Sequence, residues 1–177
     1  MYRVKDVMTE EVVSCRAGDH LEVAVRIMKE RGCGCVPVVD EKGRVVGLVT
    51  DRDAVLCALA TGKNLHELLV GDACTREVIC CESEDTLHRA ESLMRTNHVR
   101  RLPVVEEHRT LTGVVSLTDL ARHVELQASE SGTGLSPRHI AIVLAETSGV
   151  RSLPSTSHHE RERGGGAHPI VEPFFHG

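Results

Sequence analysis

The sequence predicts a mixed α/β fold of the α+β type, in which two pseudo-symmetric halves pack together and are followed by a short C-terminal helix and a disordered tail. The first reason is an internal repeat: the chain matches itself 66 residues on, without a gap, from Val4 and Val70 to Asp53 and Asp119. The second is that each copy combines short β-branched runs with segments of helical periodicity. The third is size, because one copy has too little apolar surface for independent stability and is expected to pair with the other.

The repeat keeps its register through identical residues of several chemical types, over a length that chance does not produce. It therefore indicates a tandem duplication. The matched identical pairs are Asp6/Asp72, Thr9/Thr75, Glu11/Glu77, Val12/Val78, Cys15/Cys81, Asp19/Asp85, Leu21/Leu87, Ala24/Ala90, Met28/Met94, Pro37/Pro103, Val38/Val104, Val39/Val105, Glu41/Glu107, Gly47/Gly113 and Val49/Val115.

The first repeat, residues 1–62, begins with a predicted strand and a predicted helix. The run "EVVSC" at 11–15 is rich in β-branched residues, which favours a strand. Apolar residues within 21–28 then fall on one face of a helix. Asp19 is expected to cap the start of this helix, with Glu22 supporting it, and Gly32 is expected to end it.

Two strands and a second helix complete the repeat. "CVPVVD" and "VVGLVT" read as strands joined by the turn "EKGR", and a helix follows from Thr50 to the stop at Gly62. The second repeat, residues 63–128, opens with a short helix and tether in "NLHELLVGD". It then gives the same order: "EVICC", a helix over 86–97, "RLPVVE", "LTGVVS" and a helix from Leu117.

The remaining chain divides into two parts. Residues 129–150 form a linker and a C-terminal helix, for which Ser136 is the expected N-cap and Ile140 and Val143 have helical spacing. Residues 151–177 are rich in Ser, Gly and Pro with mixed charges, a composition typical of disorder.

Composition excludes several classes of protein. The formal charge is -5, with acids and bases interspersed, and there are no Trp, one Tyr and two Phe, so neither a basic stripe nor base-stacking aromatics predict nucleic-acid binding. Charges from residue 3 onward and the lack of a long apolar run argue against a signal peptide or membrane span, and we expect a cytoplasmic protein. Its 7 Cys are expected to be reduced thiols.

Both repeats carry a hydroxyl followed three residues later by a carboxylate where a strand meets a helix. Thr50 and Asp53 form this corner in the first repeat, and Ser116 and Asp119 form it in the second. Such a pattern is a helix capping box and needs no ligand. However, the carboxyl end of a strand and the amides of a helix N-terminus also suit an anion, and a carboxylate can accept hydrogen bonds from ribose hydroxyls. The two interpretations, capping alone and nucleotide binding, remain open on these residues.

Longer stretches resemble a known family. "VKDVMTEEVVSC", "VPVVDEKGRVVGLVTDRDAVL" and "RRLPVVEEHRTLTGVVSLTDLARH" look like the two halves of a tandem CBS-domain pair, or Bateman module, over residues 1 to about 125. The resemblance implies βαββα units paired by a pseudo-twofold axis. It also implies an adenosine-containing regulatory ligand, AMP, ADP, ATP or S-adenosylmethionine, in clefts between the repeats. A homodimer that signals to an unknown effector protein is the implied assembly.

The resemblance also implies binding residues. Thr50 and Ser116 would lie near phosphate, and Asp53 and Asp119 would bind ribose. Arg52 would contact phosphate, whereas its counterpart Thr118 offers only a hydroxyl, so the two clefts should differ. The implied adenine walls and rims are Val13, Ile79, Gly34, Cys35, Val36, Pro37, Arg100, Arg101, Leu102 and Pro103.

The sequence leaves three alternatives to a nucleotide-binding module. An enzyme is disfavoured because the 11 His are scattered and only about 50 residues follow the repeats, too few for a catalytic barrel. A cysteine-based redox or metal sensor would use Cys33, Cys35, Cys80 and Cys81, although their spacing is not that of zinc sites. A structural interaction module without a nucleotide is the third reading. The sequence thus predicts a non-catalytic adenosine-sensing module and no metal site.

Overall fold

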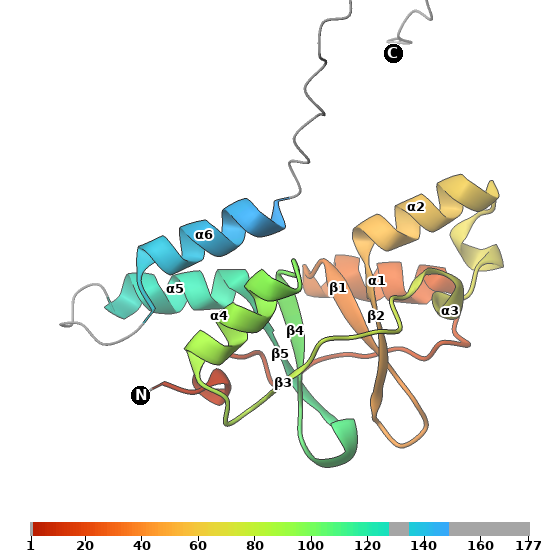
Figure 1. Ribbon diagram of the computed structural model, residues 1–177. Coiled ribbons are helices and arrows are strands. Elements are labelled where there is room, and N and C mark those ends of the chain that lie inside the picture. The colour runs from red at the N-terminus through yellow and green to blue at the C-terminus, as the bar shows by residue number, and fades with distance from the viewer. Residues whose placement is uncertain (1, 128–134, 149–177) are drawn as a thin grey trace, which may run out of the picture.

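The computed structural model describes residues 2–127 and 135–148. The predicted tail, residues 151–177, and parts of the predicted linker lie outside the described residues. The described chain forms two halves that lie side by side, each with a β-hairpin, and the helices gather at one end of these hairpins (Figure 1). The fold is mixed α/β, as predicted.

The first half follows the predicted order from its first helix onward. The β1–β2 hairpin is antiparallel, with Cys35 opposite Thr50 and a bulge after Val38. Gly32 ends α1 with a left-handed φ of 61°, and Gly62 ends α2 with a φ of 67°, both as predicted. The elements are α1 Leu21–Arg31, β1 Cys35–Val39, β2 Val45–Thr50, α2 Asp51–Thr61 and α3 Val70–Ala73, with 3-10 turns at Val4–Asp6 and Leu65–Glu67.

The second half repeats this geometry and adds one helix. Strand β4 pairs with β5 antiparallel, with Arg101 opposite Ser116 and the bulge after Val104, the residue that matches Val38. Strand β3 pairs with β4 in parallel. The elements are β3 Cys81–Glu82, α4 Leu87–Thr96, β4 Arg101–Val105, a 3-10 turn Glu107–Arg109, β5 Leu111–Ser116, α5 Leu117–Gln127 and α6 Pro137–Thr147.

Two predictions at the start of the repeat were wrong. The run at 11–15 is not a strand, because only Cys15 pairs, as an isolated bridge to Val38. β-propensity yields here to tertiary context. Asp19 does not cap α1: its carboxylate accepts a hydrogen bond from the Arg16 backbone N–H at 2.7 Å, and His20 occupies the N-cap position.

The leading segment of each repeat crosses to the opposite half. Thr9 forms a bridge with Val114, and Thr75 forms the equivalent bridge with Leu48. Val4 is fully buried in the core of the second half, while Val70 is fully buried in the core of the first. The two halves therefore share each other's first segments, which explains how two small cores become one stable unit.

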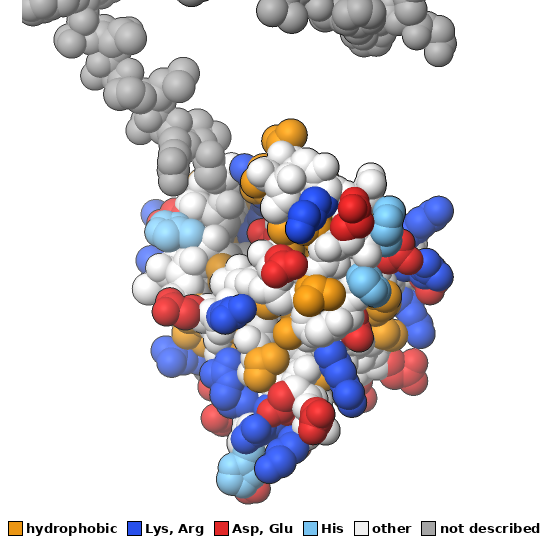
Figure 2. Space-filling view, turned by 90° about the vertical axis from the view of Figure 1, so that its right-hand side faces the viewer, with side chains coloured by type: hydrophobic (Ala, Val, Ile, Leu, Met, Phe, Trp, Pro, Cys, Tyr) orange, Lys and Arg blue, Asp and Glu red, His pale blue; other side chains and the backbone are white. Residues whose placement is uncertain are grey.

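Helix α6 covers the helices of the second half alone. It lies along α4 and α5 in Figure 1, with fully buried Val143 in the second core. The matching face of the first half keeps apolar side chains in solvent, among them Val55 at 65% and Leu59 at 78% exposure. On the side of the molecule shown in Figure 2, hydrophobic side chains are scattered among charged ones. Among the described helices, none combines the length and apolar character needed to traverse a bilayer.

Candidate functional site

Two clefts lie between the repeats, each named here for the hydroxyl of its corner. The Ser116 cleft has a volume of about 590 Å³ and the Thr50 cleft about 320 Å³, so both fall in or near the size range of small-molecule sites. The Ser116 cleft is lined by Thr9, Glu11, Val12, Val13, Ile27, Arg31, Gly32, Cys33, Gly34, Cys35, Arg101, Val114, Ser116, Thr118, Asp119 and Arg122. The Thr50 cleft is lined by Leu48, Thr50, Asp51, Arg52, Asp53, Thr75, Glu77, Val78, Ile79, His98, Val99, Arg100, Arg101 and Thr147.

Each cleft takes its corner from one repeat and its leading segment from the other. The Ser116 corner, at the β5–α5 junction, faces a wall that includes Thr9 and Val13. The Thr50 corner, at the β2–α2 junction, shares its cleft with Thr75 and Ile79. A molecule bound in either cleft would therefore contact both repeats.

The two corners have the same hydrogen bonds. Asp53 Oδ2 accepts from the Thr50 hydroxyl at 2.6 Å and from the Thr50 backbone N–H at 2.9 Å, and the Asp53 N–H donates to Thr50 Oγ1 at 3.2 Å. Ser116 and Asp119 repeat this pattern at 2.6, 2.8 and 3.2 Å. The capping box predicted from sequence is fully formed at both helix starts.

Capping leaves acceptor capacity at both corners. The capping bonds engage Oδ2 of Asp53 and of Asp119, and within the described chain no hydrogen bond reaches either Oδ1. Both carboxylates are half-buried. Each corner thus presents a free carboxylate oxygen at the positive end of an 11-residue helix, a pairing that suits a sugar hydroxyl next to an anion.

Arg101 is common to both clefts. It starts β4, and its guanidinium lies over Gly34: a Cβ built at Gly34 would be 2.9 Å from Arg101 Nη2 and 3.4 Å from Asp51 Oδ2. Glycine at 34 therefore leaves the room that this arginine occupies. The residue that matches Arg101 in the first repeat is Cys35. The two clefts therefore share one arginine at this position instead of having one from each repeat.

The model of the CBS domain matches the chain twice, over residues 4–58 and 70–126. The chain belongs to the CBS domain family.

This CBS pair is similar to a mycobacterial protein in both sequence and structure. Hypoxic response protein 1 of Mycobacterium tuberculosis is 30% identical over 124 residues, which are 70% of this chain and 86% of that protein. Its crystal structure with two coordinated zinc ions matches with a TM-score of 0.63 at 28% identity, covering 69% of this chain and 98% of the other.

Two solved structures contain adenosine compounds. CBSX2 in complex with AMP matches with a TM-score of 0.63 at 25% identity, over 73% of this chain and 100% of that chain. The CBS domain pair of protein MJ0100, in complex with 5'-methylthioadenosine and S-adenosyl-L-methionine, matches with a TM-score of 0.62 at 25% identity, over 69% and 98%.

The structure brings most of the residues expected from sequence to the cleft walls of the CBS pair. Those in the Ser116 cleft are Val13, Gly34, Cys35, Arg101, Ser116, Thr118 and Asp119. Those in the Thr50 cleft are Thr50, Arg52, Asp53, Ile79, Arg100 and Arg101. The other four, Val36, Pro37, Leu102 and Pro103, line neither cleft, because β1 and β4 carry them into the buried interior.

Sequence reasoning missed several lining residues that the repeat itself could have found. Thr9 and Thr75, Glu11 and Glu77, and Val12 and Val78 are matched pairs in which each member lines a different cleft. Most residues that line one cleft therefore lie 66 positions from a residue that lines the other. Thr147 carried no such signal, because α6 has no counterpart in the first repeat.

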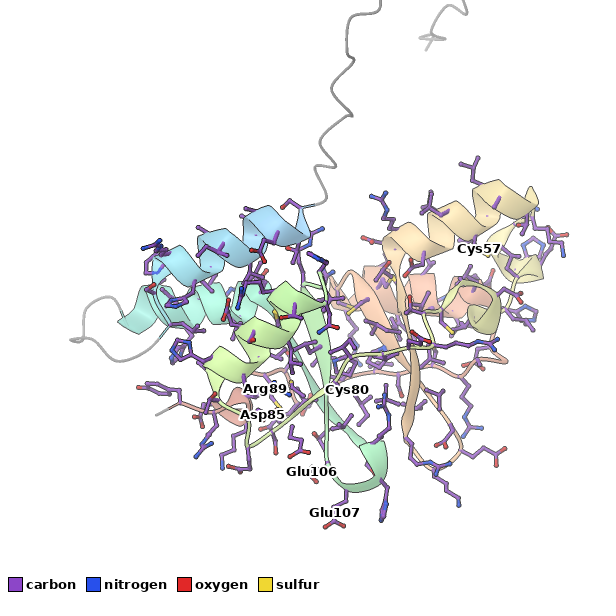
Figure 3. All side chains as sticks on the ribbon, viewed as in Figure 1. Cys57, Cys80, Asp85, Arg89, Glu106 and Glu107 are labelled. Atoms are coloured by element: carbon purple, nitrogen blue, oxygen red, sulfur yellow. The ribbon has the colours of Figure 1, made fainter. Side chains whose placement is uncertain are left out.

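The cysteines are reduced and mostly unreactive by environment. All seven are free thiols, and burial raises the pKa of Cys15 and Cys81 to about 12 and that of Cys35 to about 11. These three thiols stay neutral near pH 7, which disfavours a thiolate switch at Cys15, Cys35 and Cys81, while Cys33 is exposed. Cys57 on α2 and Cys80 ahead of β3 lie apart (Figure 3). Within residues 2–127 and 135–148, no three His, Cys, Asp or Glu side chains gather in a possible metal site.

Proposed function

We propose that this CBS pair is a non-catalytic, cytoplasmic regulatory module that binds an adenosine-containing ligand in its clefts and signals occupancy to a partner protein. The candidate ligands are AMP, ADP, ATP and S-adenosylmethionine. The observation that carries the proposal is the twofold occurrence of one corner: a hydroxyl, a half-buried carboxylate with a free oxygen, and a helix N-terminus, facing a cleft between the repeats.

The parts of a nucleotide match the parts of the clefts. The free oxygen of Asp119 or Asp53 would accept from the ribose hydroxyls. The helix dipoles, together with Arg101 and, in the Thr50 cleft, Arg52, would hold phosphate. S-adenosylmethionine would place its carboxylate there instead. The aliphatic walls, such as Val13 and Ile79, would cover the adenine ring.

Signalling would follow from the shared construction of each cleft. A ligand that contacts both repeats favours the arrangement of the halves that it binds more tightly. It can shift a partner's equilibrium only by that difference in affinity. The proposed assembly is a homodimer, which would pass the shift to the effector protein.

Two related structures support the choice of ligand class. CBSX2 holds AMP, and the MJ0100 pair holds 5'-methylthioadenosine and S-adenosyl-L-methionine. Both ligands of MJ0100 and the ligand of CBSX2 contain adenosine, the group for which the present clefts offer a ribose acceptor and apolar walls.

Thermal unfolding of the reduced protein tests the proposal, using AMP, ADP, ATP, S-adenosylmethionine, NAD, GMP and a ligand-free control. A ligand at a hundred times its Kd contributes about 2.7 kcal/mol, which raises the midpoint by roughly 5 to 10 °C in a domain of this size. A rise confined to adenosine compounds supports the proposal and ranks the ligands. A flat panel at millimolar concentrations, with a partner that still co-purifies, would contradict it and favour a structural interaction module.

A further inference from the structure

The C-terminal helix α6 lies outside both CBS matches, yet it contributes to one of the two clefts. Thr147, the last residue of α6, lines the Thr50 cleft. Its hydroxyl oxygen is buried and has no hydrogen-bond partner among the described residues. A buried hydroxyl without a partner is uncommon in folded proteins and calls for an explanation.

A second residue ties α6 to the same cleft. His98 lines the Thr50 cleft, and its Nδ1 lies 3.3 Å from the backbone oxygen of Glu146 in the last turn of α6. His98 follows α4 and has a φ of 54°, in the left-handed region. Its counterpart after α1 is Gly32, which has a φ of 61° and lines the Ser116 cleft.

These two matched positions have the same backbone conformation but different side chains. Glycine adopts a left-handed φ without steric cost, whereas histidine does so only against its preference. The second repeat nevertheless has histidine at this position, where its imidazole reaches both α6 and the cleft. The left-handed residue ends α4 as Gly32 ends α1, so the imidazole is what distinguishes the Thr50 cleft at this position.

Helix α6 is held by packing against α4 and α5. Val143 is fully buried and Ile140 packs on the second core, while Leu144 is 48% exposed. An isolated 11-residue helix is marginal in water, so α6 depends on these contacts. Because α6 is stable only when docked, a ligand that contacts its last turn would favour the docked helix. Figure 1 shows the C-terminal end of α6 directed toward the middle of the molecule, between the two halves.

We infer that α6 completes the Thr50 cleft, with Thr147 and His98 contacting a polar group of the ligand, so that ligand binding and α6 docking strengthen each other. The inference rests on the proposed function, since it names two further binding residues and a regulated element for one of its clefts. The chain beyond residue 148 is attached to the end of α6. Occupancy of the Thr50 cleft thereby becomes a signal to that segment, whereas the Ser116 cleft has no contact with α6 among its lining residues.

Hydrogen exchange read by mass spectrometry tests the link in the full chain, with AMP as the probe. AMP is expected to slow exchange in residues 143–147 roughly threefold or more, relative to peptides from residues 55–61 of α2, which line neither cleft. The Asp119→Ala background, which leaves the Thr50 cleft as the intact site, is expected to retain this slowing.

Three variants in that background test the residues. Thr147→Val keeps the shape and removes the hydroxyl, and His98→Gly restores the residue of the first repeat while relieving the left-handed backbone. Each is expected to weaken AMP binding roughly threefold or more, as for loss of one hydrogen bond, and to abolish the slowing in α6. Leu144→Ala, on the exposed face of the same helix, is the matched control and is expected to bind AMP as the background does.

The outcomes separate this inference from the proposed function. AMP binding that is equal in the background, Thr147→Val and His98→Gly, with unchanged exchange in α6, would overturn the inference and leave the proposed function standing. AMP binding confined to the Ser116 cleft would do the same. If the parent protein binds no adenosine compound, the proposed function fails at that first step and the inference fails with it.

Discussion

The Thr50 and Ser116 clefts were built by the same duplication and now differ in their rims. Their corners agree in every hydrogen bond, to within 0.1 Å. Their rims do not: Arg52 matches Thr118, and His98 matches Gly32. The Thr50 cleft, which Thr147 also lines, has a volume of about 320 Å³, whereas the Ser116 cleft has about 590 Å³. The residues that cap α2 and α5 are chemically equivalent in the two repeats, whereas these rim residues differ.

The largest effect is expected from removing one corner carboxylate at a time. Asp119→Ala should weaken binding in the Ser116 cleft, and Asp53→Ala in the Thr50 cleft, because a charged acceptor of the ribose is lost. The expected cost is about 1.5 to 3 kcal/mol, or roughly tenfold to 150-fold in Kd. Calorimetric titration with AMP and S-adenosylmethionine would show which ligand depends on which carboxylate.

The capping role of the same carboxylates requires a control. Asp119→Asn and Asp53→Asn keep an acceptor for the cap and remove the charge, so stability should fall less than in the alanine variants. If all four variants lose stability while every affinity stays at the parental value, capping is the whole role of the corners.

Arg101 lines both clefts, so its removal should affect binding in both. Arg101→Ala is expected to weaken anionic ligands in each cleft by about tenfold, as for loss of one charged hydrogen bond. Arg52→Ala should affect the Thr50 cleft alone, which makes it the matched control. An Arg101→Ala protein that loses binding in only one cleft would show that the guanidinium serves one site.

Gly34→Ala tests the position of Arg101 without removing its charge. The added Cβ would lie 2.9 Å from Arg101 Nη2, so the flexible guanidinium must move, while the backbone at 34 needs no left-handed φ. Binding in the Ser116 cleft is expected to weaken roughly threefold, with little change in the thermal midpoint. Gly18→Ala, which meets nothing within 4 Å, is the control. Parental affinity in Gly34→Ala would mean that the guanidinium position is unimportant.

A separate effect, on stability rather than binding, concerns the cores, where the halves should behave alike. Burial raises the pKa of Cys15 and Cys81 from 9.0 to about 12. The unfolded chain therefore loses these protons at lower pH than the folded protein. The stabilisation that comes from keeping these thiols neutral is complete below pH 9. The free energy of unfolding should then fall as the pH rises from 9 toward 12.

Urea unfolding across this pH range measures the two contributions. Cys15→Ala and Cys81→Ala should each flatten the decline by a similar amount, while exposed Cys33→Ala serves as the control. A decline that is identical in the parent and both variants would show that these thiols ionise equally in the folded and unfolded states.

Local signals made much of the fold predictable. The turn "EKGR" predicted the first hairpin, the repeat predicted the second, and glycine after α1 and α2 predicted the ends of those helices. The start of α1 was not predictable from Asp19, because the Leu21 N–H that begins the helix donates to the backbone oxygen of Leu68, 2.8 Å away. A distant segment provides what a local cap was expected to provide.

The candidate site was predictable to the extent that it lies within the repeat. The corners and the entry residues of β1 and β4 reach the cleft walls, but Val36 and Leu102 turn into the cores, which depends on tertiary packing. The exchange of leading segments between halves is non-local and left no pattern of its own. The repeat matches His98 with Gly32, so its position could have been predicted from the sequence. The place of Thr147 in the cleft could be found only from the structure.

The most direct test of the central claim is calorimetric titration of AMP into the parent and into the Asp53→Asn/Asp119→Asn double variant, with thermal unfolding to confirm that both are folded. We predict that the parent binds AMP and that the folded double variant binds it roughly a hundredfold more weakly or not at all, since both ribose acceptors have lost their charge. Parental affinity in the folded double variant would contradict the claim that these corners bind an adenosine ligand.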